Sequence, residues 1–275
     1  MADNIQLETF RLWENGAPLA DTKVPTVTFY PTYQKVSNAA VVIFPGGGYT
    51  WCAPHEGGGY AYLISTLGIN AFVVDYRVAP ASFPCPLLDA RRAVRFVRAN
   101  AEKFGIDKDK VIVMGSSAGG HLAALLSTFR GGIDGEGVDE VDNEDYLPSA
   151  QVLCYPVISS DEAISHHGSY HNLLGDLYAK REAYDPSLLA DEKTPPAFIW
   201  HTAEDACVPV MNSILYAQAL AAYKKFFAVH IYSFGYHGLS TADGLACWPL
   251  DEAQKATHNW LRDAKDWLNA TFYDL

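Results

Sequence analysis

One short run of the sequence has the residue types and spacing of a nucleophile held on a tight turn. The run is GSSAG at residues 115–119, which fits the pattern Gly-x-Ser-x-Gly around Ser117. An apolar strand at 111–114 leads into it and a helix beginning at Ala118 leads out, which is the strand–turn–helix setting that exposes a serine hydroxyl. Glycines are expected two before and two after Ser117, because side chains there would clash across the turn. Ser116 is the competing hydroxyl, but its offset from both glycines is wrong.

A serine hydroxyl is a poor nucleophile until a base takes its proton and an acid orients that base. In the fold that carries this turn, the three residues follow the chain order serine, acid, histidine. Asp205 comes after the apolar run 197–200, with the adjacent Glu204 as its rival. His237 follows the last apolar run, 229–232, in a loop with glycines on both sides. We therefore predict Ser117 as nucleophile, Asp205 as acid and His237 as general base.

Acyl transfer also needs N–H groups aimed at the oxygen that becomes negative in the transition state. The run PGGGY at residues 45–49 follows the apolar strand 41–44. Its three glycines let backbone N–H groups approach a ligand with no Cβ in the way. The predicted oxyanion donors are the N–H groups of Gly47, Gly48 and Ala118. A phosphate-binding loop is the alternative, and it fails because no matching glycine and lysine pattern follows.

Three aromatic residues near these loops are candidates for the wall of a substrate pocket: Tyr49, Trp51 and Tyr155. Flat rings can stack on a sugar, so an acetylated carbohydrate is the first expected substrate. Core packing is the alternative, because aromatic side chains are more often buried.

The other histidines have ordinary structural explanations. His201 lies at a strand end near the acid, so a core position is expected and a role in orienting the acid is the alternative. His166, His167 and His171 lie close together, but no carboxylate pattern supports a metal site. We therefore predict neither a metal nor a cofactor.

The elements that position these residues alternate between apolar strands and amphipathic helices. Strands that are apolar on both faces are typical of a parallel sheet covered by helices on each side. This predicts an α/β architecture of the α/β-hydrolase type, with a mostly parallel, doubly wound sheet of about eight strands and helices on both faces. An antiparallel strand at 26–30 is expected to precede it. Expected strands lie at 41–44, 71–76, 111–114, 152–155, 197–200 and 229–232, and expected helices at 87–104, 118–129, 210–223 and 251–268.

The sequence reads as one domain, residues 1–275, interrupted by two segments without this alternation. Residues 131–148 are acidic and contain several glycines, and residues 160–194 are mixed and rich in histidine. Both follow strands, where active-site lids and pocket walls usually sit. We expect them to be candidate lids or pocket walls, with an ordinary surface loop as an equal alternative for the first.

Composition excludes several classes of partner. The formal net charge of −12 argues against nucleic acid and anionic membranes, because both favour clusters of Lys and Arg. No basic segment followed by an apolar run opens the sequence, and no apolar run approaches the ~20 residues of a spanning helix. We therefore expect a cytoplasmic protein with no membrane partner. Five scattered cysteines without a C-x-x-C pair suggest neither a zinc site nor a disulfide framework.

The chain resembles the α/β-hydrolase esterases of the hormone-sensitive-lipase-like type and the related bacterial acetyl-esterase and xylan-esterase group. The resemblance spans about residues 39–239. It rests on the serine turn, on the glycine loop, and on DYRVAP at 75–80 with a following Phe-Pro at 83–84, which is similar to the family's Tyr-Arg-Leu-Ala-Pro segment. It implies the same nucleophile, acid, base and oxyanion donors that the chemistry predicts.

The glycine loop departs from the hormone-sensitive-lipase-like pattern. That pattern begins with histidine, and here Pro45 takes its place. The Pro-Gly-Gly-Gly-Tyr form, and Glu56 with Gly57 downstream, look more like the acetyl-esterase branch. The resemblance thus implies esters with small acyl groups rather than lipids. A structural role is expected for Glu56, with shaping of the pocket as the alternative.

Three functions are compatible with these residues. The first is a serine carboxylic-ester hydrolase that acts on short-acyl, small-molecule esters through an acyl-enzyme. The second is an amidase, formamidase or peptidase with the same triad. The third is a non-catalytic ligand-binding protein on the same fold, which a broken triad would favour, and here every member is present. The oligomeric state, a homodimer included, is left open.

Overall fold

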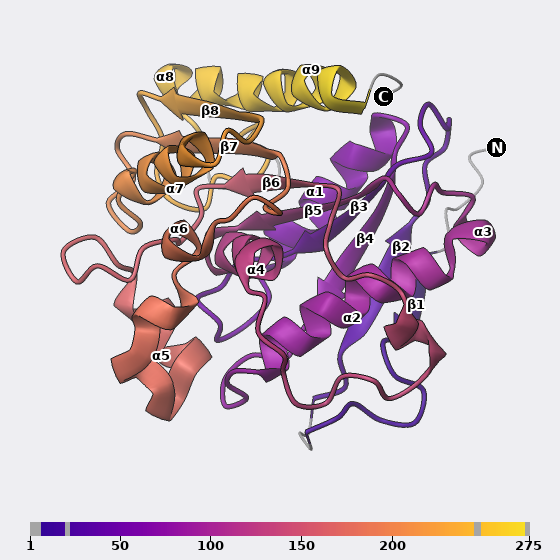
Figure 1. Ribbon diagram of the computed structural model, residues 1–275. Coiled ribbons are helices and arrows are strands. Elements are labelled where there is room, and N and C mark those ends of the chain that lie inside the picture. The colour runs from indigo at the N-terminus through magenta and orange to yellow at the C-terminus, as the bar shows by residue number, and fades with distance from the viewer. Residues whose placement is uncertain (1–6, 20–22, 245–248, 273–275) are drawn as a thin grey trace.

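A computed structural model describes residues 7–19, 23–244 and 249–272 of the chain. At its centre is an eight-stranded sheet in the order β1-β2-β4-β3-β5-β6-β7-β8 (Figure 1). Strands β1 and β2 pair antiparallel, as do β2 and β4, and every later pair is parallel. The strands are β1 Glu8–Arg11, β2 Thr26–Tyr30, β3 Ala40–Phe44, β4 Asn70–Asp75, β5 Val111–Ser116, β6 Ala150–Cys154, β7 Ala197–Thr202 and β8 Phe227–Tyr232.

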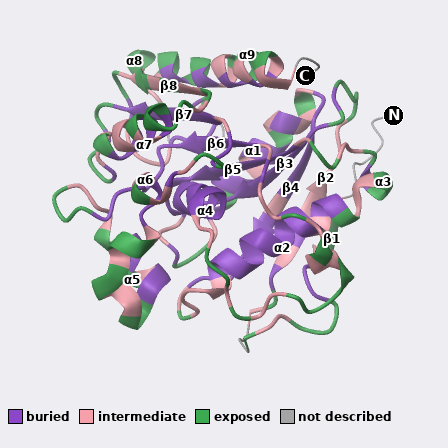
Figure 2. Cartoon of the chain, in the orientation of Figure 1, coloured by how far each residue is buried: buried purple, intermediate pink, exposed green. Residues whose placement is uncertain are grey.

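Helices cover both faces of this sheet. One face is packed by α2, α4 and α7, and the other by α1 and α9, so that alternate residues of the central strands point into two separate cores. All residues of α4 are buried, which Figure 2 shows as a purple helix against the sheet. The predicted doubly wound α/β-hydrolase sheet is confirmed. The helices are α1 Pro54–Thr66, α2 Cys85–Ala99, α3 Ala101–Phe104, α4 Ser117–Thr128, α5 His167–Leu174, α6 Pro186–Leu189, α7 Met211–Ala222, α8 Glu252–Lys255 and α9 Trp260–Phe272, with 3₁₀ turns η1 Glu140–Asn143, η2 Gly175–Tyr184 and η3 Ala256–Asn259.

The segment 131–148, expected to be a lid, a pocket wall or an ordinary surface loop, is fastened to α2. Its acidic side chains pair with arginines along that helix: Arg91 and Arg95 both contact Glu136 at 2.9 Å, and Arg92 contacts Asp139 at 2.6 Å. The arginines are largely buried, so each charge has its partner within the fold. The acidic composition of the segment is thus explained by α2 rather than by a substrate.

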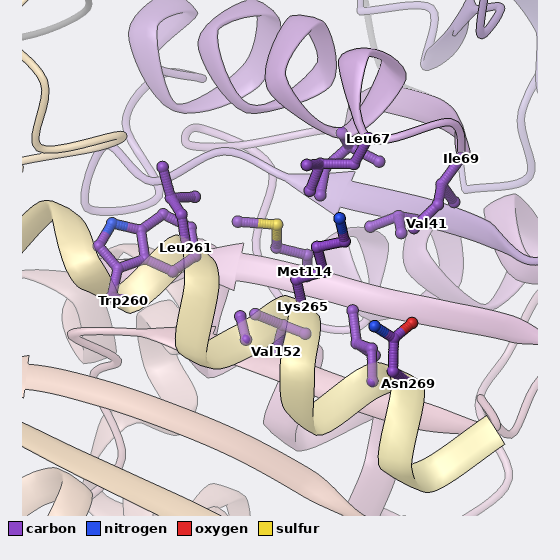
Figure 3. Close-up of a pocket in the computed structure, with 12 residues that line it drawn as sticks. Val41, Leu67, Ile69, Met114, Val152, Trp260, Leu261, Lys265 and Asn269 are labelled. Carbon is purple, nitrogen blue, oxygen red and sulfur yellow. The ribbon is translucent and has the colours of Figure 1, made fainter. Parts of the chain in front are cut away.

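A small apolar pocket lies between the sheet and α9, on the face away from α4 (Figure 3). Met114 and Val152 of the sheet face Leu261 and Leu268 of the helix across it. Its volume of about 20 Å³ holds one water molecule rather than a substrate. We therefore regard this pocket as a packing gap.

Candidate active site

Ser117 occupies a strained turn at the junction of β5 and α4. Its φ of 53° is in the left-handed region, which a serine adopts only where the surrounding structure imposes it. A Cβ added to Gly115 would overlap the carbonyl of Gly119. A Cβ added to Gly119 would lie 2.5 Å from the carbonyl oxygen of Pro45 and closer still to that of Phe44. The two glycines of the motif therefore let the turn close on itself and let α4 approach the end of β3.

The structure brings the three predicted side chains into one chain of hydrogen bonds. His237 Nε2 lies 2.8 Å from Ser117 Oγ, and its Nδ1 lies 2.7 Å from Asp205 Oδ2. Because the ionised carboxylate can only accept, Nδ1 carries the ring proton and Nε2 is left to accept from the serine hydroxyl. Each residue comes from a loop at the carboxyl end of a strand: β5, β7 and β8 respectively for the serine, the acid and the histidine. This is the arrangement in which a base activates a hydroxyl.

The carboxylate of Asp205 is held ionised by its surroundings. Its Oδ1 accepts from the backbone N–H groups of Cys207 and Val208, at 2.9 and 2.8 Å. Its Oδ2 receives His237 and lies 3.2 Å from Nε2 of His201. Burial alone would raise the pKa of Asp205, but the hydrogen bonds from His201 and His237 outweigh it and hold the pKa well below its usual range.

His201 does more than fill the core. It is fully buried, with Nδ1 2.8 Å from Ser213 Oγ and Nε2 2.9 Å from the carbonyl oxygen of Val208. Donation from Nε2 fixes the loop on which Asp205 sits and places the same proton near the carboxylate. Its position four residues before the acid, at the end of a strand, was the sequence signal for this role.

The two rival side chains have other partners. Glu204 accepts from the backbone N–H of Gly235 at 2.9 Å, which ties the loop of the acid to the loop of His237. Ser116 is fully buried and its hydroxyl is 2.9 Å from that of Tyr60, away from the histidine. The side chains bonded to His237 are therefore Ser117 and Asp205 rather than their two neighbours.

The glycine loop presents free backbone donors beside the serine. Gly47 and Gly48 have φ values of 120° and 63°, which glycine adopts without strain. Across the described residues, neither of their N–H groups donates to another protein atom. The N–H of Ala118 belongs to the first turn of α4, where backbone donors have no partner within the helix. These three groups can thus serve an oxyanion, and that role stays a prediction.

The loop is held from behind by bonds to its carbonyl groups. Asn172 of α5 donates from Nδ2 to the oxygen of Gly48 at 2.8 Å. Tyr76 donates to the oxygen of Pro45 at 2.6 Å, and this contact supports the loop at the position where histidine stands in the hormone-sensitive-lipase-like pattern. Sequence reasoning missed Asn172, because nothing in the local pattern links α5 to a loop more than a hundred residues earlier.

Glu56 is a buried structural carboxylate beneath this loop. Its Oε2 accepts from the N–H of Gly46 at 2.9 Å, and its Oε1 accepts from the hydroxyl of Tyr155 at 2.7 Å. Tyr155 also receives the N–H of Ser240 at 2.9 Å and packs its ring 5.1 Å from that of His237. The carboxylate therefore couples the glycine loop to the loop that carries the histidine.

Two of the three aromatic side chains expected in the pocket wall are buried in the protein core and do not line the pocket. Tyr155 is buried by the contacts just described, and Tyr49 is 1% exposed, with its hydroxyl 2.8 Å from Nδ1 of His121. Both hydroxyls are satisfied inside the protein, so neither side chain reaches the pocket. Trp51 does line the pocket and is 54% exposed. The pocket prediction is thus corrected to Trp51 alone.

The pocket that opens on Ser117 has a volume of about 290 Å³. It combines the nucleophile and base with the free donors of the loop and with side chains from distant segments. The segment 160–194 contributes His166 to its wall, and segment 131–148 contributes nothing among the residues described. Other lining residues are His55, Glu56, Cys207 and Gly238.

No group of three or more His, Cys, Asp or Glu within the described ranges is placed to hold a metal ion. His167 and His171 instead contact Tyr178, through a 2.8 Å hydrogen bond and a stacked ring. None of the helices in the described part of the chain has the length and apolar character that crossing a bilayer requires.

Two known proteins are similar to this chain along most of its length. The endo-1,4-beta-xylanase B of Butyrivibrio fibrisolvens is 38% identical over 226 residues, which are 80% of this chain and 35% of that protein. The acetylxylan esterase of Xylanibacter ruminicola is 33% identical over 256 residues, which are 88% of this chain and 48% of that protein. The chain therefore spans less than half of either relative.

Solved structures match over the whole fold. An acetyl ester-xyloside bifunctional hydrolase from Caldicellulosiruptor lactoaceticus is 37% identical, covers 96% of both chains and has a TM-score of 0.83. A carboxylesterase from Lactobacillus plantarum shares the fold, with a TM-score of 0.80 at 24% identity over 97% of this chain and 98% of the other. The model of the BD-FAE family matches residues 28–220. The chain thus belongs to the BD-FAE family and has the α/β-hydrolase fold.

Proposed function

We propose that this chain is a serine carboxylic-ester hydrolase that acts on short-acyl esters, with acetylated carbohydrates as its substrate class. The observation that carries the proposal is the continuous chain of hydrogen bonds from Ser117 through His237 to Asp205, next to unpaired N–H groups of the glycine loop. The relatives whose names refer to acetylxylan and acetyl esters support the substrate class.

The proposed reaction uses these groups in two steps. His237 takes the proton of Ser117 while the serine oxygen attacks the ester carbonyl, and the N–H groups of Gly47, Gly48 and Ala118 stabilise the oxyanion. When the tetrahedral intermediate collapses, His237 returns the proton to the leaving alcohol oxygen. Water then attacks the acyl-enzyme with His237 as base, releasing the carboxylic acid and restoring the serine. Asp205 stays ionised throughout and stabilises the imidazolium.

The pocket supports a small acyl group. A volume of about 290 Å³ lies at the lower end of small-molecule sites, which suits an acetyl group with part of a sugar rather than a long chain. The exposed ring of Trp51 offers a flat apolar face to that sugar. An amidase, formamidase or peptidase would use the same triad, and parallel assays with an anilide and an ester of the same acyl group separate these activities.

The decisive test compares two neighbouring serines. Ser117→Ala should lower kcat for 4-nitrophenyl acetate by ~10³-fold or more, because the nucleophile is lost. Ser116→Ala is the matched control: it removes the neighbouring hydroxyl from the same turn and should stay within about threefold of the unaltered chain. A fluorophosphonate probe should label the chain and the control but not Ser117→Ala. Full activity in Ser117→Ala would refute the proposal.

Several features of the whole protein remain predictions. We propose a single domain over residues 1–275, with the segment 160–194 as the pocket wall. Cell fractionation tests the predicted cytoplasmic location, and light scattering tests whether the protein forms a homodimer.

A further inference from the structure

His166 stands in the pocket with Ser117 and His237, yet the mechanism above gives it no role. Its ring Nδ1 lies 3.3 Å from the backbone N–H of Ser169 and 2.8 Å from the Ser169 hydroxyl, and it caps the first turn of α5. A backbone N–H can only donate, so Nδ1 accepts, and the neutral ring carries its proton on Nε2. No protein atom in the described part of the chain accepts that N–H.

The ring is neutral near pH 7. Burial lowers the pKa of His166 below its ordinary 6.5. The pocket wall therefore holds a hydrogen-bond donor whose tautomer is fixed by the helix cap behind it. It is not a second general base, because Nδ1 is engaged by Ser169 and the remaining nitrogen, Nε2, is the protonated one.

The position of His237 indicates which part of the substrate lies near this donor. Because His237 returns its proton to the leaving alcohol oxygen, the alcohol must lie beside its Nε2. His166 lines the same pocket as His237 and Ser117. His166 thus flanks the space that the alcohol part of the substrate occupies.

We propose that the Nε2–H of His166 donates a hydrogen bond to a hydroxyl or ring oxygen of the substrate's alcohol part, so that the site selects sugar alcohols over phenols. This inference rests on the proposed ester hydrolysis. A phenol or a simple alkyl alcohol has no further hydroxyl or ring oxygen beside the scissile ester and leaves the donor unused. Sites that form such a bond discriminate against analogues that lack the partner atom.

The segment offers two complementary substitutions and a control. His166→Asn keeps an acceptor for the Ser169 N–H, since asparagine is a favoured cap, but its shorter side chain withdraws the donor from the pocket. His166→Gln places an amide N–H₂ near the position of Nε2. His167→Asn alters the neighbouring histidine, which lies outside the pocket and whose two ring nitrogens contact Tyr178 and Glu162.

The experiment measures kcat/KM for two acetates that differ only in their alcohol: an acetylated xylo-oligosaccharide and 4-nitrophenyl acetate. His166→Asn should lose roughly fivefold to tenfold on the sugar ester, the ordinary effect of one lost neutral hydrogen bond, and less than twofold on the aryl ester. His166→Gln should recover most of the sugar activity, and His167→Asn should match the unaltered chain on both substrates.

Two results would overturn the inference and are distinguishable. Equal losses on both esters in His166→Asn, or no loss on either, would show that His166 does not recognise the alcohol, and the proposed function would stand. An unaltered chain that hydrolyses neither ester would overturn the proposed function, and the inference with it.

Discussion

Substitution of Gly119 by alanine tests how closely the serine turn must approach the glycine loop. The new Cβ would lie 2.5 Å from the oxygen of Pro45, whereas real Cβ contacts essentially never fall under 3.0 Å. Both atoms are backbone-bound, so no side chain can rotate to make room. The contact with the carbonyl oxygen of Phe44 is shorter still, so helix α4 must withdraw from β3 by more than 0.5 Å, which takes Ser117 away from the predicted oxyanion donors.

A shift of that size reaches the tolerance of about 0.5 Å within which catalytic groups must be held. We expect Gly119→Ala to lower kcat/KM for 4-nitrophenyl acetate by roughly tenfold to a hundredfold. Overpacking should also lower the free energy of unfolding by about 1–3 kcal/mol. The assay pairs initial rates with urea unfolding followed by circular dichroism.

Gly132→Ala is the matched control, because a Cβ there has no neighbour within 4 Å and the residue has no positive φ. It should change neither activity nor stability. If Gly119→Ala retained activity within threefold of the unaltered chain, the steric account of the turn would be wrong.

Three further perturbations address the surroundings of the site. Burial lowers the pKa of His121 to about 4 from an ordinary 6.5, so the unfolded chain takes up a proton first on acidification. The free energy of unfolding should therefore be highest above pH 6.5 and fall by roughly 3 kcal/mol towards pH 4. Urea titrations of His121→Gln at a series of pH values should lack this fall. Glu56→Ala leaves the N–H of Gly46 without its acceptor and removes one partner of the Tyr155 hydroxyl, and it should cost about 2–4 kcal/mol of unfolding free energy. Glu56→Gln should be milder, and equal losses would contradict the hydrogen-bond account. Asn172→Ala should reduce kcat about fivefold with KM little changed, because one hydrogen bond to the glycine loop is lost. A change in KM alone in steady-state kinetics would contradict this role of Asn172.

The sheet and the chain order of the triad could be predicted because both depend on local patterns. Apolar runs bounded by glycines mark buried strands, and each functional residue follows such a run directly. Helix α1 was not predicted, because three consecutive glycines in it disfavour a helix. Tertiary contact decides there: a Cβ on Gly57 would lie 2.9 Å from Val73 of β4, so a small residue lets the helix approach the sheet.

The pocket was harder to predict than the triad. Whether an aromatic side chain after a strand lines a cavity or lies beneath it depends on its hydroxyl partners, and those of Tyr49 and Tyr155 come from residues 72 and 99 positions away. Strand β1 was missed for a related reason: its residues are mostly exposed, so no apolar pattern marks it. Contacts between distant segments leave no periodic signal in a single sequence.

The bond from Asn172 to Gly48 has a consequence for redesign of the protein. A common engineering strategy grafts a new wall segment onto a fixed catalytic core in order to change the substrate. Here the wall helix α5 carries one of the braces of the core's own glycine loop, at 2.8 Å. A grafted segment that lacks an amide at this point would change turnover along with selectivity. Recombination boundaries should therefore keep residue 172 with the loop it braces, and exchange only the residues that precede it.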